Sequence, residues 1–263
     1  MANIHPSAYV DKSAEIDSSV EIGPMAYVGP RCILHKGVRI GAQAMVETDT
    51  EIGEDTYIYP NAYVGCDPQD VSYGGEQSRL VIGKRNKIRE FTNISRGTAK
   101  EELLTEIGDD NLIMAGVHVA HDCRLGSNII IANYTALTGH VRVADSAFIS
   151  GFVGVHQFVR IGTQSMIASH SRVGKDVPPY CTIHDNAIAG LTIIGLRRRN
   201  VSSDARAELK KAMRLIIDLG VPFDTLPAKL AELEQFEEIK HFVDFVQSSK
   251  RGMIRRFRNE DEE

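Results

Sequence analysis

Aliphatic residues recur at every sixth position along the first two thirds of the chain. Ile, Val or Leu stands at 4, 10, 16 and on to 64, returns at 82, 88 and 94, and resumes from 107 to 173. The residue four places after each aliphatic is usually small, as at Ala8, Ala14, Ala26, Ala44, Thr50 and Ala62. The residue directly after the aliphatic one is often glycine, as at Gly23, Gly29, Gly41, Gly53, Gly126 and Gly162. Side chains alternate along short strands, so the aliphatic and small positions share one interior. Glycine is expected at tight corners because it accepts backbone angles that other residues resist.

This six-residue period is the signature of a parallel β-helix. The hexapeptide-repeat proteins that it resembles coil left-handed, with about 18 residues per turn and coils stacked about 4.8 Å apart. The predicted fold class is therefore an all-β left-handed parallel β-helix with a C-terminal α-helical domain. The predicted domains are residues 1–190 and 191–263.

Two polar stretches interrupt the repeat, near 66–79 and 96–106. Insertions of this kind usually form loops that carry function on one face of a solenoid. The period ends at Pro178 and Pro179, which break the strand pattern. Beyond them, Ser202 or Ser203 is the expected N-cap of an amphipathic helix and Gly220 its stop. Apolar residues at helical spacing predict another helix; they are Ile239, Phe242, Val243 and Val246. We expect this tail to cap the last coil.

The composition narrows the class of protein. Apolar residues make up 43% and charged residues 25% of the 263 residues, which is typical of a globular protein. The net charge of −5 gives no bias towards nucleic acid. No signal peptide and no membrane span are predicted, because no apolar run reaches the roughly 18 residues that a span requires. The cysteines are widely spaced, at 32, 66, 123 and 181, so we expect neither disulfides nor structural zinc, and a cytoplasmic location.

Four histidines converge on one patch of the predicted coil. Val119, Leu137 and Val155 are spaced eighteen positions apart, so they stack on one face. The histidines that follow or flank them, on that face or its corner, are His118, His121, His140 and His156. Cys123 falls at the small inward position and is expected to be a buried core residue rather than a nucleophile.

The patch suits several kinds of chemistry. A zinc-dependent hydratase resembling the hexapeptide carbonic anhydrases would use three histidines shared between subunits. We prefer a general base without a metal, since histidine titrates near neutrality and can take a proton from a sugar hydroxyl. His121 is the imidazole of this patch whose chain neighbour is a carboxylate, Asp122. Gly139 can present a bare backbone N–H to an oxyanion. In a solenoid with a purely structural role, histidines would not be expected to gather on one face of the coil.

Further motifs make the chain resemble the UDP-N-acetylglucosamine O-acyltransferases of lipid A biosynthesis. The resemblance covers nearly the whole chain, and its motifs are QDVSY (69–73), IREFTNISRGT (88–98), HVAHDC (118–123), LTGHV (137–141), GVHQF (154–158), DVPPY (176–180), GLRRR (195–199) and SKRGMIR (249–255). An N-acyltransferase of the same pathway usually carries another domain before its repeats, whereas here the repeats begin at Ile4.

The resemblance implies a homotrimer with sites between subunits, and direct transfer from acyl carrier protein to the 3-hydroxyl of a UDP-sugar nucleotide, with no cofactor. It implies that His121 is the general base, Asp122 its partner and Gly139 the oxyanion donor. The implied substrate-binding residues are Gln69, Asp70, His118, His140, His156, Gln157, Arg198 and Arg199, the two arginines holding phosphate. The implied acyl-chain ruler is Ser169 with Met166 nearby, which by volume admits roughly 12 to 14 carbons.

The chain also departs from that family. Ser72 stands where lysine is usual, Ser95 where histidine is usual, and Thr192 and Ile194 where an Asn and a Glu commonly meet the nucleotide. The residues that bind the nucleotide are therefore expected to differ from those usual in the family, and a 3-amino sugar nucleotide is an alternative acceptor. We expect outward Met114 and Phe152 to be covered in the trimer. A basic segment is expected to dock the acidic carrier protein; it contains Lys250, Arg251, Arg255, Arg256 and Arg258.

Overall fold

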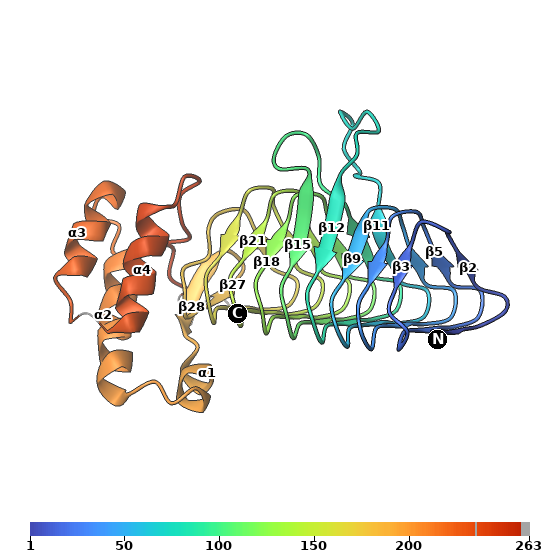
Figure 1. Ribbon diagram of the computed structural model, residues 1–263. Helices are drawn as coiled ribbons and strands as arrows, with labels where there is room; N and C mark the ends of the chain where they lie inside the picture. Colours follow the sequence, from blue (N-terminus) through green and yellow to red (C-terminus); the bar gives the residue numbers. More distant parts are fainter. Residues whose placement is uncertain (235, 259–263) are drawn as a thin grey trace.

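The computed structural model describes residues 1–234 and 236–258. It is a left-handed β-helix whose coils stack along one axis, with a helical region lying over the end of the last coils (Figure 1). The short strands of the described residues form three sheets, one for each side of the coil. The predicted fold class is confirmed.

Up to β26, the strands of each sheet come from every third position in chain order, and the antiparallel pair β27 and β28 then ends the first sheet. The first sheet holds β1 (Asn3–Ile4), β4 (Glu21–Ile22), β7 (Arg39–Ile40), β10 (Tyr57–Ile58), β13 (Lys87–Ile88), β16 (Leu112–Ile113), β19 (Ile130–Ile131), β22 (Phe148–Ile149), β25 (Met166–Ile167), β27 (Cys181–His184) and β28 (Ala187–Leu191). The second holds β2 (Tyr9–Val10), β5 (Tyr27–Val28), β8 (Met45–Val46), β11 (Tyr63–Cys66), β14 (Asn93–Ser95), β17 (His118–Val119), β20 (Ala136–Leu137), β23 (Gly154–Val155) and β26 (Arg172–Val173). The third holds β3 (Glu15–Ile16), β6 (Ile33–Leu34), β9 (Thr50–Ile52), β12 (Arg79–Ile82), β15 (Leu104–Ile107), β18 (Arg124–Leu125), β21 (Arg142–Val143) and β24 (Arg160–Ile161).

The aliphatic positions stack directly on one another. Val119 pairs with Leu137, and Leu137 with Val155, in parallel register. All three are buried, as are the small residues such as Ala44 and Ala62. The periodic pattern therefore predicts both the strands and the side that each residue presents to the core.

The glycines of the repeat have a different role from the one expected. The left-handed corner positions are held mostly by other residues, such as Met25 and Arg31. A Cβ on Gly41 would lie 2.5 Å from the backbone nitrogen of Pro60 in the next coil, and one on Gly162 would lie 2.4 Å from that of Pro179. Glycine is therefore required for the close approach of stacked coils, and the prediction that it relieves strained backbone angles at these positions was wrong.

Both insertions leave the same corner of the coil, between the second and third sheets, and project from it (Figure 1). The strands extend further into them than the sequence suggested. β12 begins at Arg79 and β15 at Leu104, so the loops proper are residues 67–78 and 96–103.

The C-terminal region contains α1 (Ile193–Arg198), α2 (Ser203–Ile217), the short 3-10 helix η1 (Phe223–Thr225), α3 (Leu226–Ala231) and α4 (Glu237–Gln247). Ser202 is the N-cap of α2, since its hydroxyl accepts from the Ala205 amide. The helix ends at Ile217 with Asp218 as its cap, so Gly220 lies beyond the stop that it was expected to form. Phe242 of α4 packs on Tyr180 of the last coil. No helix of the described residues is both long enough and apolar enough to span a bilayer.

Candidate active site

The histidine site lies at the corner from which both insertions project. The chain turns out of β17 through His121 and Asp122, and the next coil turns at the same place through Gly139 and His140. The His140 amide donates to the His121 carbonyl at 3.0 Å, so the two turns stack. Both imidazoles are nearly buried, at 3% and 5% exposure.

His121 and Asp122 form a buried pair. Nδ1 of His121 lies 2.8 Å from Oδ2 of Asp122, the contact that the sequence suggested. Asp122 is fully buried and also accepts from the Thr98 amide and hydroxyl, at 2.8 and 2.6 Å. A carboxylate only accepts, so Nδ1 carries the proton in the neutral imidazole and Nε2 keeps its lone pair. This is the tautomer that a general base needs.

Gly139 lies against the His121 ring. A Cβ at this position would fall 2.5 Å from Cε1 and 2.8 Å from Nε2 of His121. Among the described residues no group accepts from the Gly139 amide.

The first insertion brings Asp70 to the other nitrogen of His121. Oδ2 of Asp70 lies 3.6 Å from Nε2 and accepts from the ammonium of Lys100 at 2.6 Å. Oδ1 accepts from the amide and hydroxyl of Ser72 at 2.8 and 2.7 Å. The Lys100 ammonium, followed by Ser72, holds the pKa of Asp70 well below its ordinary value. Gln69 is exposed on the same loop.

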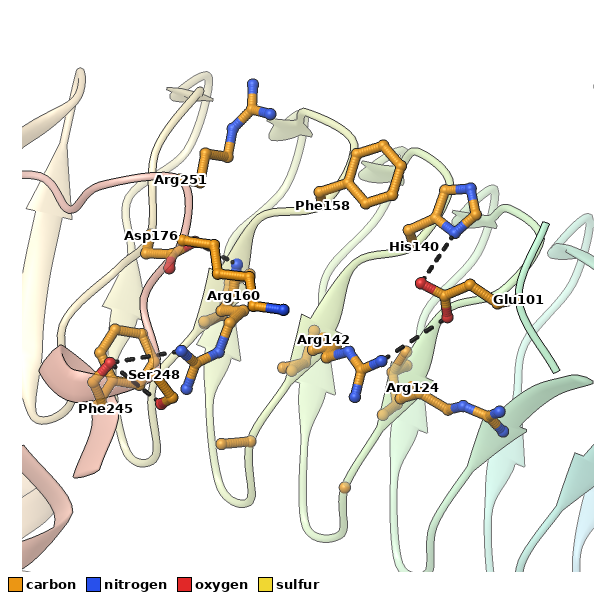
Figure 2. Close-up of a pocket in the computed structure, with 16 residues that line it drawn as sticks. Glu101, Arg124, His140, Arg142, Phe158, Arg160, Asp176, Phe245, Ser248 and Arg251 are labelled. Carbon is orange, nitrogen blue, oxygen red and sulfur yellow. Dashed lines mark hydrogen bonds and ion pairs between the residues drawn. The ribbon is translucent and has the colours of Figure 1, made fainter.

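His140 has a carboxylate of its own, supplied by the second insertion. Its Nδ1 lies 3.3 Å from Oε1 of Glu101, and its ring stacks on Phe158 at 4.3 Å (Figure 2). The chain neighbours alone had singled out His121 as the imidazole of this patch beside a carboxylate, and the loop corrects that view. The rings of His121 and His140 meet edge to face at 5.1 Å.

His118 and Cys123 complete the immediate surroundings. Nδ1 of His118 lies 3.0 Å from Oδ1 of Asn93, and burial lowers the pKa of this histidine. Cys123 is fully buried, and burial raises the pKa of its thiol to about 12. A thiol held in its neutral form is not a nucleophile, in agreement with a core role.

A metal ion would find ligand atoms here. One atom each from His121, Asp122 and His140 lies within 4.8 Å of the others. However, the Asp122 oxygen facing both rings already accepts from the Thr98 hydroxyl and from Nδ1 of His121. This hydrogen-bonded set suits proton transfer better than it suits a Lewis acid.

The remaining sequence-predicted residues lie outside this buried cluster. His156 and Gln157 are exposed, and Nδ1 of His156 lies 2.9 Å from the guanidinium of Arg251. Met166 and Ser169 are exposed on and after β25. Arg198 and Arg199 are exposed at the end of α1 and make no recorded contact with the histidines among the described residues.

A basic pocket of about 1020 Å³ adjoins His140 (Figure 2). Arg124, Arg142 and Arg160 stack in register along β18, β21 and β24 and line it with Lys250 and Arg251. Sequence reasoning overlooked this arginine column, although its spacing of eighteen residues was the signal that revealed the histidines. Thr98, Lys100 and Glu101 were also missed, and no periodic signal marks them.

Arg255, by contrast, was expected on the docking surface and has a structural role. Its guanidinium donates to the carbonyls of Ile216 and Val221, at 2.6 and 2.8 Å, and to that of Asp218. It therefore ties the C-terminal segment to the end of α2.

Comparisons with known proteins agree with this fold. The family model described as UDP N-acetylglucosamine O-acyltransferase, domain 2, matches residues 176–254, and the bacterial transferase hexapeptide model matches 31–66 and 104–139. The acyl-acyl-carrier-protein UDP-N-acetylglucosamine O-acyltransferase of Verminephrobacter eiseniae is 42% identical over 97% of this chain and all of its own length. A UDP-N-acetylglucosamine acyltransferase structure from Bacteroides fragilis has a TM-score of 0.92 at 39% identity, covering 96% of this chain and all of that one. The Moraxella catarrhalis structure scores 0.93 at 38% identity, covering 96% and 99%.

Proposed function

The chain belongs to the UDP-N-acetylglucosamine O-acyltransferase family, and we propose that it moves a 3-hydroxyacyl chain from acyl carrier protein to the 3-hydroxyl of UDP-N-acetylglucosamine in lipid A biosynthesis. The observation that carries this proposal is the buried pair of His121 and Asp122, whose hydrogen bond leaves Nε2 as the unprotonated nitrogen of the neutral ring, packed against Gly139.

The transfer needs no covalent enzyme intermediate. Nε2 of His121 takes the proton of the sugar 3-hydroxyl while its oxygen attacks the thioester carbonyl, and the new C–O bond forms. The Gly139 amide donates to the resulting oxyanion. Collapse breaks the C–S bond, and the thiolate of the carrier's phosphopantetheine takes the proton from the imidazolium. Asp122 stabilises that imidazolium, and no cofactor takes part.

The acceptor sugar nucleotide binds at the corner of the coil that carries His121 and His140. Asp70 and Gln69 contact the sugar, and His118, His140, His156 and Gln157 line the site. Arg198 and Arg199 hold phosphate, for which the guanidinium group is well suited. The hydroxyl of Thr192 donates to the carbonyls of Gln164 and Tyr180, and Ile194 is exposed, so the uridine is held differently here from the usual Asn and Glu pair.

The assembly is a homotrimer. Outward apolar residues form a ladder along β16, β19, β22 and β25, where Leu112, Ile130, Phe148 and Met166 stand in register. Tyr134 and Phe152 are 61% and 55% exposed at the adjoining corner, and stack at 5.4 Å. Neighbouring subunits and the acyl chain cover these surfaces. The donor and the four free cysteines favour action in the cytoplasm.

An acyl-transfer assay tests the proposal. Purified enzyme is given 3-hydroxyacyl carrier proteins of several lengths with UDP-N-acetylglucosamine or with its 3-amino analogue, and metal content is measured in parallel. We expect ester formation with the 3-hydroxyl acceptor. Exclusive amide formation would favour the 3-amino sugar nucleotide. Stoichiometric zinc with bicarbonate-forming activity and no transfer would favour the hydratase.

A further inference from the structure

The base of this enzyme lies between two carboxylates, which raises a problem for its chemistry. Asp122 faces Nδ1 of His121 at 2.8 Å and Asp70 faces Nε2 at 3.6 Å. Two negative charges on opposite sides favour the doubly protonated ring, because an opposite charge within about 4–6 Å stabilises the charged form. An imidazolium has no lone pair with which to take a proton. Some feature must therefore offset the second carboxylate.

Lys100 supplies the opposing charge. Its ammonium lies 2.6 Å from Oδ2 of Asp70, the same oxygen that faces Nε2. The side chain of Asp70 is 7% exposed, so water screens it poorly. The other oxygen is held by Ser72, which stands where the family usually carries lysine. The cation at Asp70 thus comes from the second insertion rather than from position 72.

We propose that Lys100 is a positioning residue, which holds the Asp70 carboxylate and neutralises it so that Nε2 of His121 stays unprotonated and free to act as the base. This inference rests on the proposed base role of His121. In the part of the chain that the structure describes, the His140 imidazole lies 5.1 Å from that ring and the Gly139 backbone packs against it. The pKa of His118 is lowered by burial and, to a smaller extent, by the charge of His121. Glu101 lies on the far side, against His140. Lys100 is the cation recorded in contact with Asp70 among the described residues.

The fold explains why this residue sits in the loop. The same segment anchors Asp122 through Thr98 and reaches His140 through Glu101. Its backbone is fixed at Thr98 by the buried corner, which directs the next residues over Asp70. The second insertion therefore contacts the carboxylates on both sides of His121, Asp122 through Thr98 and Asp70 through Lys100.

The experiment compares the wild-type enzyme with Lys100→Met, Lys100→Arg, Asp70→Asn and the double variant Lys100→Met/Asp70→Asn. In Lys100→Met the acidic limb of the pH profile of kcat/KM should move up by about one to three pH units, with activity recovering in alkali. Lys100→Arg should keep the wild-type limb. The double variant should return the limb towards wild type, because the unpaired charge is gone, although its overall rate is lower. Lys84→Met is the matched control, since Lys84 forms an exposed pair with Glu54 at 3.1 Å.

A direct titration separates this inference from the proposed function. The ring nitrogens of His121 are followed by NMR in histidine-labelled enzyme, with His121→Ala to assign the signal, and no turnover is needed. Protonation of the ring at higher pH in Lys100→Met than in wild type supports the inference even if the substrates prove to be different. A purely structural role would change KM or melting temperature and leave both the limb and the titration in place. That result would overturn it.

Discussion

The α-carbon of Gly139 faces the His121 imidazole so closely that a Cβ there would lie 2.5 Å from Cε1. Contacts below 3.0 Å are not tolerated, so any side chain at 139 must displace either the ring or the turn that carries His140. The position of the His121 ring thus depends on the absence of a side chain at residue 139.

Gly139→Ala should therefore lower kcat by about a hundredfold, the order expected when a reacting group is misplaced by about an ångström. The melting temperature should change little, since the clash is with one ring at the edge of the core. Steady-state kinetics and thermal unfolding measure the two effects. Gly174→Ala is the control, because a Cβ there meets nothing within 4 Å. If Gly139→Ala kept kcat within twofold, the close packing would have no catalytic importance.

His121→Ala should lose about 10²–10⁴-fold in kcat, the range for general base catalysis, while the oligomeric state and the melting temperature stay those of the wild-type enzyme. Asp122→Asn keeps an oxygen for Thr98 but offers an amide to Nδ1, which favours the wrong tautomer, so kcat should fall with little change in KM. Asp122→Ala should also destabilise the fold, because the buried Thr98 amide loses its acceptor. Retention of more than about a tenth of wild-type kcat by His121→Ala would rule out the mechanism.

The β-helical part of the molecule could be predicted because the six-residue period of its aliphatic residues fixes the register in which the coils stack. Val119 and Leu137 stack at the expected spacing, and the stacking carries His121 and His140 to one corner. The adjacency of Asp122 and His121 at a corner suggested their contact, and the structure shows it. The same spacing relates Arg124, Arg142 and Arg160. From the sequence alone, however, a column of charged residues on outward positions is equally consistent with an ordinary solvated surface.

The insertions could not be predicted in the same way. A loop without a period gives no register, so nothing in the sequence places Lys100 beside Asp70 or Glu101 beside His140. Arg255 shows the complementary limit. Its charge suggested a docking surface. In the folded chain, however, its guanidinium donates to the carbonyls at the end of α2, so its role is structural. The sequence does not show this contact.

The acyl ruler is tested at Ser169. The residue is exposed after β25, whose Met166 stands in register with Phe148, and a larger side chain there should shorten the surface open to an acyl chain if the chain lies along this strand. Wild-type enzyme should prefer roughly 12 to 14 carbons, and Ser169→Met should shift the preference to shorter donors. Rates with a series of acyl carrier proteins measure the profile, and Ser18→Met on an exposed corner of an early coil is the control. An unchanged profile in Ser169→Met would place the ruler elsewhere.

Arg255 should matter for stability rather than for the donor. Arg255→Glu removes a donor from three backbone carbonyls and puts a negative charge at the end of α2, where the helix dipole disfavours it. The melting temperature should fall by several degrees while KM for the acyl carrier protein changes little in the folded enzyme. Differential scanning calorimetry and donor kinetics give the two readings. A raised KM with an unchanged melting temperature would return Arg255 to the docking surface.

The carrier protein should instead dock at the arginine column. Arg142 is 59% exposed and its carboxylate partner Glu101 lies 3.7 Å away, so its charge is largely available, and it lines the pocket with Arg160 and Lys250 (Figure 2). Acyl carrier proteins are acidic, so Arg142→Glu should raise KM for the donor several-fold and flatten its rise with salt, while KM for the sugar nucleotide stays the same. Arg39→Glu makes the same change of charge on an early coil of the first sheet and should do neither. Equal effects of the two variants, or a donor KM that ignores salt in the wild-type enzyme, would show that this column does not steer the carrier.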